Sequence, residues 1–301
     1  MDYTVFEADL ICSGVEVIQA EPISRHTTIG LGGCADYFAK PKTVIELIKC
    51  LELAKKHGVR FILLGRGSNV LVSDKGFRGL VVSTCDVDEI NVERTTNQTA
   101  FVRAFCGVSL QALNAFCYKN GLTGLEFLSG IPGSVGGAVT MNAGFAGKSI
   151  SDITVSVFCL SNGFYTSKYS NECGFEYRNS IFQSSDSVVI SALFRTKFTN
   201  ISQVKEKLAL YKTLRKTPSG KSMGSIFKNG EIPAGKIIDV AGLKGVRIGG
   251  AYVSQNHANV IINDGSATSC EVYDLIKTIK LEVKEKFGLT LEEEIKYVGE
   301  F

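Results

Sequence analysis

The sequence contains neither a long hydrophobic run nor a basic leader. No stretch of about 18 consecutive apolar residues, the minimum for a membrane-spanning helix, occurs in the chain. The first residues carry Asp2, Glu7 and Asp9 instead of the basic and apolar segments of a signal peptide. We therefore expect a protein without a membrane span that stays in the cytoplasm.

Closely spaced cysteine pairs are also missing. The nine cysteines are odd in number and none forms a C-x-x-C pair. This disfavours both a disulfide framework and a zinc site. Scattered thiols fit a reducing cytoplasm, where cysteine behaves as a small buried hydrophobe. We predict no bound metal.

Charge is distributed unevenly along the chain. Residues 199–290 hold 14 Lys and Arg against 8 Asp and Glu, a net charge of +6, so the remainder of this +3 protein carries −3. A basic C-terminal portion attracts an anionic ligand such as a nucleotide, although a solvated basic face is an equally good explanation. Nucleic acid is disfavoured because no aromatic platform is interleaved with the basic residues.

Hydrophobic periodicity divides the chain into three regions. Helical spacing and end signals predict helices over 43–58, 109–121, 201–216, 235–243 and 268–288, the third of them basic and amphipathic. Thr43 with Glu46 and Thr268 with Glu271 form capping-box patterns. Strand patterns occupy 61–65, 79–107, 151–198 and the EEEIKYVG stretch near the end. The order predicts an α+β protein with regions 1–82, 83–198 and 199–301, in which the last strand packs back on the first region.

Two nucleotide-binding fingerprints are disfavoured. No G-x-x-x-x-G-K-[ST] motif is present, which excludes P-loop chemistry. GLGGCA at 30–35 matches the dinucleotide pattern G-x-G-x-x-A, but that pattern must open a helix. The strand-like ADYFAKP follows instead, so we do not expect a Rossmann site here.

Two other glycine-rich stretches are better candidates. GRGSN at 65–69 follows a predicted strand, and the exposed backbone N–H groups of such a turn form an anion-binding concavity, unless it is a plain turn between strands. LSGIPGSVGGAVTMNAG at 128–144 holds five glycines within fifteen positions, although glycine weakens local structure. We predict that the two loops grip a pyrophosphate from two sides, with a flat ring against bare backbone.

The motifs carry a specific resemblance. LLGRGSNVLVSD followed by GLTGLEFLSGIPGSVGGAVTMNAG resembles the FAD-binding module of the vanillyl-alcohol-oxidase type. Over roughly residues 22–299 the chain is similar to the UDP-N-acetylenolpyruvoylglucosamine reductase family of peptidoglycan synthesis. Its shorter type leaves the substrate cleft more open. HTTIGLGGCADYF, YRNSIF, GSIFKNG and LEEEIKYVG match in the family's order.

The resemblance implies a three-region flavoprotein with a two-part FAD-binding module and a C-terminal α/β substrate-binding domain. NADPH reduces FAD, and the flavin then delivers hydride to the enolpyruvyl double bond of UDP-N-acetylglucosamine enolpyruvate, giving UDP-N-acetylmuramate for cell wall biogenesis, cell shape and cell division. The chain has no histidine between Arg60 and Asn256, so we expect FAD to be bound non-covalently. The implied cofactor-binding residues are Gly65, Arg66, Gly67, Ser68, Asn69, Gly130, Ile131, Pro132, Gly133, Ser134, Gly136, Gly137 and Ala138.

The resemblance also implies three catalytic residues. Arg178 would be the cation beside the substrate carboxylate, because its planar fork matches two oxygens. Ser225 matches the proton donor: a hydroxyl is a weak acid, but an enolate carbon is basic enough to take its proton. Glu294 matches the family's acidic residue, and we expect burial and nearby negative charge to raise its pKa. Within the EEE run strand alternation puts Glu292 and Glu294 on one side, and Glu294 aligns best.

By the same matching Tyr177, Lys228 and Asn229 are substrate contacts, and Lys228 suits a diphosphate. The sequence departs from the family at Gly230 and Lys221, where the family usually has proline. Since proline restricts the backbone, these changes should loosen the turn that carries Ser225. We expect a monomer that acts on a nucleotide sugar.

Two alternatives belong to different classes. An oxidase of a sugar or alcohol on the same flavin fold would keep the two glycine loops but not the Arg178, Ser225 and Glu294 set. A non-catalytic nucleotide-sugar binding protein would be colourless and would not oxidise NADPH.

Overall fold

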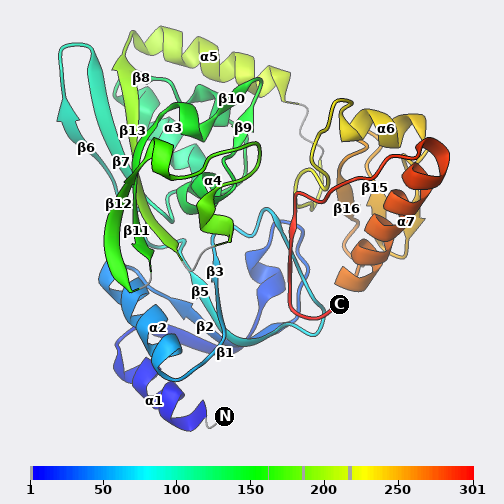
Figure 1. Cartoon of the computed structure of the whole chain (residues 1–301), viewed down its shortest axis with the longest axis horizontal. Helices are drawn as coiled ribbons and strands as arrows, with labels where there is room; N and C mark the ends of the chain where they lie inside the picture. The colour runs from blue at the N-terminus through cyan, green and yellow to red at the C-terminus, as the bar shows by residue number, and fades with distance from the viewer. Residues whose placement is uncertain (1–2, 162, 185–186, 216–218) are drawn as a thin grey trace.

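The computed structural model describes residues 3–161, 163–184, 187–215 and 219–301, in three groups of strands with their helices (Figure 1). The first group is a four-stranded sheet of order β1-β2-β5-β3, in which β1 is antiparallel to β2 and the other pairs are parallel. Its strands are β1 (Glu16–Pro22), β2 (Cys34–Lys40), β5 (Phe77–Ser83) and β3 (Phe61–Leu64), and its helices are α1 (Tyr3–Cys12) and α2 (Val44–Lys56).

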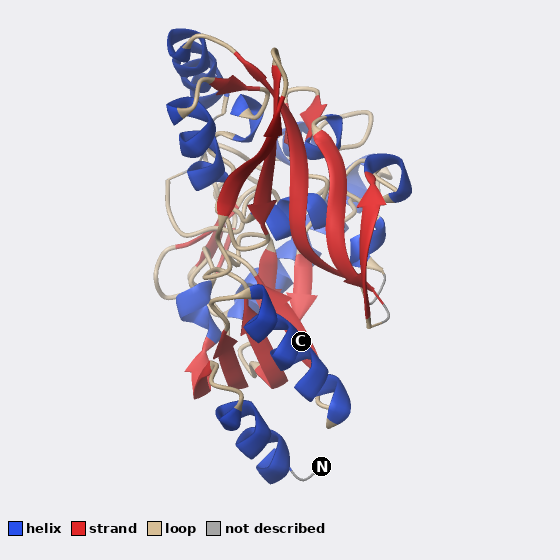
Figure 2. Cartoon of the chain, turned by 90° about the vertical axis from the view of Figure 1, so that its left-hand side faces the viewer, coloured by secondary structure: helices blue, strands red, loops and turns tan. Residues whose placement is uncertain are grey.

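The second group is built on an antiparallel sheet of order β12-β11-β13-β7-β6, with β8 on β13. Figure 2 shows its long, twisted strands side by side. The strands are β12 (Phe164–Tyr169), β11 (Thr154–Ser161), β13 (Val188–Phe198), β7 (Thr99–Phe105), β6 (Ile90–Thr95) and β8 (Leu122–Thr123). The helices are α3 (Leu110–Lys119), α4 (Val135–Thr140) and α5 (Ile201–Leu214), and a small hairpin joins β9 (Gly144–Phe145) to β10 (Lys148–Ser149).

The third group is smaller. Strands β14 (Arg247–Ile248), β15 (Ala251–Val253) and β16 (Ile261–Asn263) form an antiparallel sheet with α6 (Ala234–Val240) and α7 (Ser269–Phe287). The chain then returns to the first group, where β17 (Lys296–Val298) pairs in parallel with β4 (Val70–Val72) (Figure 1). Short 3-10 helices cover Ile23–His26, Glu126–Leu128, Ile150–Asp152, Ser170–Glu172 and Ile181–Gln183.

Each group has its own apolar core, and two of these cores extend into a neighbouring group. The packed faces of α1, α2 and the first sheet include Phe6, Leu10 and Leu47. The same cluster takes in Leu160 and Ile190 from the second sheet. The third group closes over Leu275 and Ile276 of α7. Burial of this apolar area is the main stabilising term and fixes how the first two groups meet.

Capping explains where the predicted helices begin. The Thr268 hydroxyl accepts a hydrogen bond from the Glu271 N–H, and the Glu271 carboxylate accepts one from the Thr268 N–H, which together form the capping box. Gly288 ends α7 in the left-handed conformation. Thr43 caps α2 in the same way, but Glu46 accepts from the Lys42 N–H instead of from Thr43. Only one of the two hydrogen bonds of the predicted capping box, the one that Thr43 accepts, is therefore present at α2.

Two of the predicted elements differ from the structure for physical reasons, and the strand expected after GLGGCA is present. The amphipathic pattern over 201–216 gives α5, but Val204 is its only buried residue because the helix lies along the edge of the second sheet; residue 216 is outside the described residues. Cys34 begins strand β2 directly after GLGG, so the helix that a Rossmann site needs is not there. The closing strand begins only at Lys296. None of the described helices is both long and apolar enough to cross a membrane.

Candidate active site

A cavity of about 1070 Å³ lies where the groups meet. It is of the size of a large small-molecule site, which is typically about 300–1,000 Å³. Its wall contains both glycine loops, from Gly65 to Asn69 and from Ile131 to Ala138 with the exception of Val135. Arg178, Ser225 and Glu294 line it as well. The structure thus brings to one cavity most of the residues that the sequence singled out.

The first loop, residues 65–69, joins β3 to β4. Gly67 has φ +58°, and a Cβ there would lie 2.1 Å from the His26 carbonyl oxygen, so that only glycine fits. Within the described part of the chain, the N–H groups of Arg66, Gly67 and Ser68 donate to no acceptor. Since backbone donors in folded proteins are nearly always paired, this loop offers its amides to a bound acceptor or to water.

The second loop holds glycines for two different reasons. A Cβ at Gly136 would lie 2.9 Å from the Cys106 Cβ, and one at Gly144 would lie 2.3 Å from the Lys148 carbonyl oxygen, so protein packing requires both. Gly133 and Gly137 line the cavity and meet nothing closer than 3.6 Å. At these two positions a side chain would intrude into the cavity.

Ser134 joins the two loops. Its hydroxyl accepts a hydrogen bond from the Gly137 N–H at 3.4 Å and caps α4. A Cβ at Gly65 would lie 2.5 Å from that same hydroxyl oxygen. Close approach of the loops therefore requires glycine at 65, and the loops form adjoining walls of one cavity.

The cavity wall is strongly cationic. Among the described residues that line it, six are basic and only Glu294 is acidic. The basic residues are Lys55, Arg60, Arg66, Arg178, Arg215 and Lys296. A site with this charge is suited to a ligand that carries several negative charges.

Three segments distant in sequence are tied together beside the first loop. The Asn69 amide donates to the Glu294 carbonyl oxygen at 3.1 Å, and the Glu294 N–H donates to the Ile226 carbonyl oxygen at 2.7 Å. Thr28 donates through its N–H to the Gly67 carbonyl at 3.1 Å and through its hydroxyl to the Ser222 carbonyl at 2.6 Å. These bonds place Ser225 and Glu294 at the edge of the loop.

Asparagines also fix the segment that carries Ser225. Asn259 accepts from the Phe227 N–H at 2.9 Å and donates to its carbonyl at 2.8 Å, and its own carbonyl accepts from the Ile226 N–H. The Lys221 carbonyl accepts from the Asn263 N–H at 2.9 Å. Hydrogen bonds therefore hold the segment at Lys221, one of the two positions where proline is absent, and at Ile226 and Phe227 beside Ser225.

Arg178 enters the cavity from the loop before Ile181–Gln183. Its φ of +55° is the left-handed conformation, which costs a residue with a Cβ roughly 1–3 kcal/mol. The Nη2 atom donates to the Gly144 carbonyl at 3.1 Å, and the guanidinium carbon lies 5.2 Å from the centre of the Tyr177 ring. The Nε atom lies 2.8 Å from Oε1 of Glu294, an ion pair whose N–H is not aligned for a hydrogen bond.

Glu294 is the acidic side chain of this wall and only 15% of it is exposed. Burial raises its pKa above the ordinary value of 4.5, while Arg178 and Lys228 act in the opposite direction. The sequence predicted a raised pKa for Glu294 from burial and from nearby negative charge. Burial raises it, but the charged neighbours are cations and lower it. Neighbouring side chains of the EEE run have different partners. Glu292 pairs with Lys228, whereas Glu293 pairs with Lys280 of α7 at 2.7 Å.

The predicted substrate contacts lie beside the cavity and not in its wall. The Tyr177 hydroxyl accepts from the Asn229 N–H at 3.2 Å, and the Asn229 side chain accepts from the Ala234 N–H at the start of α6. Lys228 is paired with Glu292. Gly130 also lies outside the wall; its φ is +75°, and a Cβ there would meet the Arg215 side chain at 3.1 Å.

Sequence reasoning missed several wall residues. Lys55 lies in the last turn of α2, Arg60 lies between α2 and β3, and Arg215 directly follows α5. Nothing in the local sequence distinguishes Arg215 from the other basic residues of LYKTLRK. Only the tertiary structure shows that this arginine turns inward.

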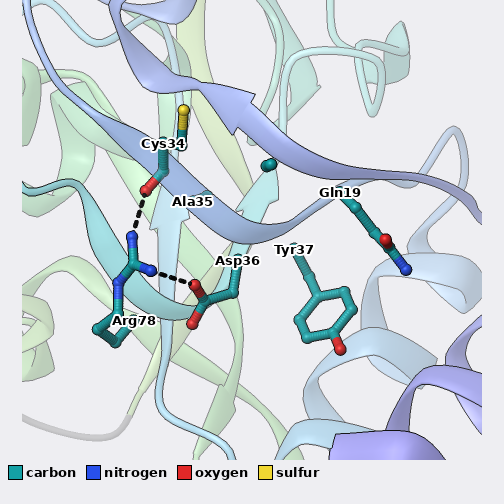
Figure 3. A pocket seen from close by; sticks show the side chains of 7 residues that line it. Gln19, Cys34, Ala35, Asp36, Tyr37 and Arg78 are labelled. Atoms are coloured by element: carbon teal, nitrogen blue, oxygen red, sulfur yellow. Dashed lines mark hydrogen bonds and ion pairs between the residues drawn. The ribbon is translucent and has the colours of Figure 1, made fainter.

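A smaller hollow of about 500 Å³ opens elsewhere, on the first sheet (Figure 3). Arg78 spans it by donating to the Cys34 carbonyl at 3.1 Å and pairing with Asp36 at 2.7 Å. Because these polar groups already satisfy each other, the hollow offers no free donor set. Its lining also contains none of the predicted catalytic, cofactor-binding or substrate-binding residues.

Two family models match separate parts of the chain. An FAD binding domain model matches residues 35–161, and a model of the UDP-N-acetylenolpyruvoylglucosamine reductase C-terminal domain matches residues 215–298. Alkyldihydroxyacetonephosphate synthase shares the fold, with a TM-score of 0.52 and 17% identity over 65% of this chain and 41% of that one. The fold and the cavity define an FAD-dependent oxidoreductase with a flavin-binding module of the vanillyl-alcohol-oxidase type.

The relatives are more specific. The chain is 40% identical over 303 residues to UDP-N-acetylenolpyruvoylglucosamine reductase of Caldicellulosiruptor bescii, covering 98% of this chain and 95% of the relative. The crystal structure of UDP-N-acetylenolpyruvylglucosamine reductase (MurB) from Thermus caldophilus matches with a TM-score of 0.80 and 30% identity, over 95% of this chain and 99% of that one. The chain belongs to the UDP-N-acetylenolpyruvoylglucosamine reductase family.

Proposed function

We propose that this protein reduces the enolpyruvyl double bond of UDP-N-acetylglucosamine enolpyruvate to give UDP-N-acetylmuramate, a peptidoglycan precursor, with FAD as cofactor and NADPH as reductant. The observation that carries the proposal is the convergence of Arg178, Ser225 and Glu294 on a cationic cavity walled by two glycine loops. The name of its relatives, UDP-N-acetylenolpyruvoylglucosamine reductase, supports the same substrate.

The cavity fits FAD. The unpaired amides of Arg66, Gly67 and Ser68 and the basic wall suit a pyrophosphate, and Gly133 and Gly137 leave room for a ring against the backbone. When bound, FAD takes hydride from NADPH and supplies it to the terminal alkene carbon. The cavity wall contains no histidine among the described residues, and burial raises the pKa of the Cys106 thiol to about 12. An inert thiol supports non-covalent binding.

Arg178, Ser225 and Glu294 stabilise the negative charge that develops on the substrate and supply the proton that neutralises it. Hydride addition leaves negative charge on the carbon next to the carboxylate, and a fixed cation at that point lowers the barrier. Arg178 lies at the cavity wall for this role and is oriented by Glu294 and the Gly144 carbonyl. Ser225 gives its hydroxyl proton to the carbon. Glu294 lines the same wall as Ser225 and is the acidic group that returns a proton to it.

Tyr177, Lys228 and Asn229 form the outer part of the proposed substrate site. Tyr177 belongs to the second group and Asn229 to the third, and their hydrogen bond joins the two beside the cavity. Lys228 adds positive charge for the diphosphate of the nucleotide. We also propose that the chain divides into regions after residues 82 and 198. We further propose a monomeric state, a cytoplasmic location, and roles in cell wall biogenesis, cell shape and cell division.

The direct test is product analysis. The purified protein, given NADPH and the enolpyruvyl nucleotide without oxygen, should oxidise one NADPH for each product molecule, and the product should be heavier than the substrate by two hydrogen atoms. Oxygen consumption with a simple sugar or alcohol, and no turnover of the nucleotide, would assign the protein to the flavin oxidases instead. A colourless protein that binds the UDP-sugar without oxidising NADPH would be a binding protein.

A further inference from the structure

Arg215 is a half-buried cation that forms no ion pair within the described part of the chain. It follows the last turn of α5 and lines the cavity. Its Nε and Nη2 atoms are inaccessible to solvent and meet no hydrogen-bond acceptor in the described part of the chain. An unpaired buried charge is among the most costly features a protein can carry. We therefore expect the guanidinium to turn toward the cavity that it lines when a ligand there supplies the missing acceptors.

The surroundings of Arg215 hold its guanidinium in a fixed plane. The guanidinium carbon lies 4.2 Å from the centre of the Phe145 ring, and the Arg215 side chain also packs at Gly130. Phe145 follows Gly144, whose carbonyl accepts from Arg178. The small β9–β10 hairpin thus positions both guanidinium groups at one corner of the cavity.

Charge compensation at this corner is incomplete. Arg178 is paired with Glu294, at 2.8 Å, and Nη2 of Arg178 is engaged by the Gly144 carbonyl. Arg215 has no such partner. Burial, with a smaller contribution from the charge of Arg178, lowers the pKa of Arg215 to about 10, so it is still charged at neutral pH. The corner consequently needs one further negative charge, presented by a group with two acceptor oxygens.

We propose that Arg215, whose side chain lines the cavity, turns its guanidinium toward the carboxylate of the enolpyruvyl group and binds it, with Arg178 beside it. A guanidinium fork and a carboxylate match in geometry, and charged hydrogen bonds of this kind are the strong ones. This assignment rests on the proposed function and adds to it a second carboxylate-binding arginine. It also leaves Arg178 free to face the neighbouring carbon, where the charge develops.

The test compares two nucleotides that differ in the carboxylate. Binding of UDP-N-acetylglucosamine enolpyruvate and of UDP-N-acetylglucosamine, which has no enolpyruvyl group, is measured on the oxidised holoenzyme by the change in flavin absorbance. Replacing Arg215 by Gln should weaken binding of the enolpyruvyl nucleotide by about 10- to 100-fold, in line with the loss of charged hydrogen bonds. Binding of UDP-N-acetylglucosamine should change less than about twofold. Lys212→Gln, on the exposed side of α5, removes the same charge and should change neither.

Other outcomes overturn the proposal in distinct ways. A lowered flavin midpoint potential in Arg215→Gln, with both affinities unchanged, would show that Arg215 serves the flavin and not the substrate. Equal weakening for both nucleotides would place the arginine at the UDP moiety or in the structure alone. If Arg215→Gln does not fold, Arg215→Lys gives the same comparison, since it keeps the charge and loses the fork. If the wild-type holoenzyme binds neither nucleotide, the proposed function itself fails.

Discussion

The Nε atom of Arg178 lies 2.8 Å from Oε1 of Glu294. One side chain comes from the second sheet's loops, and the other comes from the segment that runs back to pair with β4. Both are largely buried, with 20% and 15% of their side chains exposed. The pair joins the walls of the cavity and holds the arginine fork in one orientation, where a fixed cation lowers a barrier most.

Arg178→Lys should lower kcat/KM by about 100-fold, because a lysine keeps the charge but loses the planar fork that faces both Glu294 and the Gly144 carbonyl. Steady-state NADPH oxidation with the enolpyruvyl nucleotide measures this. Arg103→Lys is the matched control, since Arg103 also pairs with a carboxylate, that of Glu93, but lies on the second sheet outside the cavity wall. Wild-type kinetics in Arg178→Lys would remove Arg178 from the site.

Ser225→Ala should leave reduction of the flavin by NADPH nearly unchanged and slow its reoxidation by the enolpyruvyl nucleotide by about 10²- to 10⁴-fold, the usual contribution of a positioned proton donor. Stopped-flow absorbance separates the two half-reactions. Ser222→Ala, in the same segment, removes a hydroxyl but keeps the carbonyl to which Thr28 donates, and should affect neither. Loss of flavin reduction in Ser225→Ala, with the fold intact, is incompatible with a proton-donor role.

Glu294→Gln should change how stability depends on pH. Because burial raises the folded-state pKa of Glu294, the native protein holds this proton more tightly than the unfolded chain does. The resulting stability is present below the ordinary value of 4.5 and is lost as pH rises through the raised pKa. The wild type should therefore gain stability relative to Glu294→Gln as pH falls from 8 towards 4.5. Urea unfolding at several pH values measures the difference, and a gain in the opposite direction would mean that Arg178 outweighs burial.

Gly67→Ala should unfold the first loop or abolish FAD binding, because the new Cβ would lie 2.1 Å from the His26 carbonyl oxygen. Gly58→Ala is the control for backbone strain. Gly58 also has a left-handed φ, +64°, but a Cβ there meets nothing within 4 Å. We expect Gly58→Ala to cost about 1–2 kcal/mol in the free energy of unfolding and Gly67→Ala distinctly more. Equal losses in thermal or urea unfolding would contradict the packing argument.

Local signals predicted the helices well. The Thr268 and Glu271 box and Gly288 lie at the ends of α7, because capping depends on residues within one turn. Helix α1 was not predicted, because its buried Phe6 and Leu10 are fixed by packing in the same core as α2. The brief helix α4 was hidden by the glycines of its own sequence.

The site was predictable where motif and chemistry coincide and not where tertiary contacts decide. The two glycine loops and the Arg178, Ser225 and Glu294 set all reach one cavity. The left-handed backbone of Arg178 could not be foreseen, because an arginine carries no signal for that conformation. From the sequence alone, Arg215 cannot be distinguished from the surface cations of a basic helix. Its contact with Phe145 and its place in the cavity wall show that the side chain points inward.

An anaerobic absorbance titration tests the central claim most directly. The purified protein should show a flavin spectrum that bleaches with NADPH and returns when UDP-N-acetylglucosamine enolpyruvate, but not UDP-N-acetylglucosamine, is added. A protein that shows no flavin absorbance and takes up no added FAD, or whose bleached flavin does not respond to the enolpyruvyl nucleotide, would contradict the account.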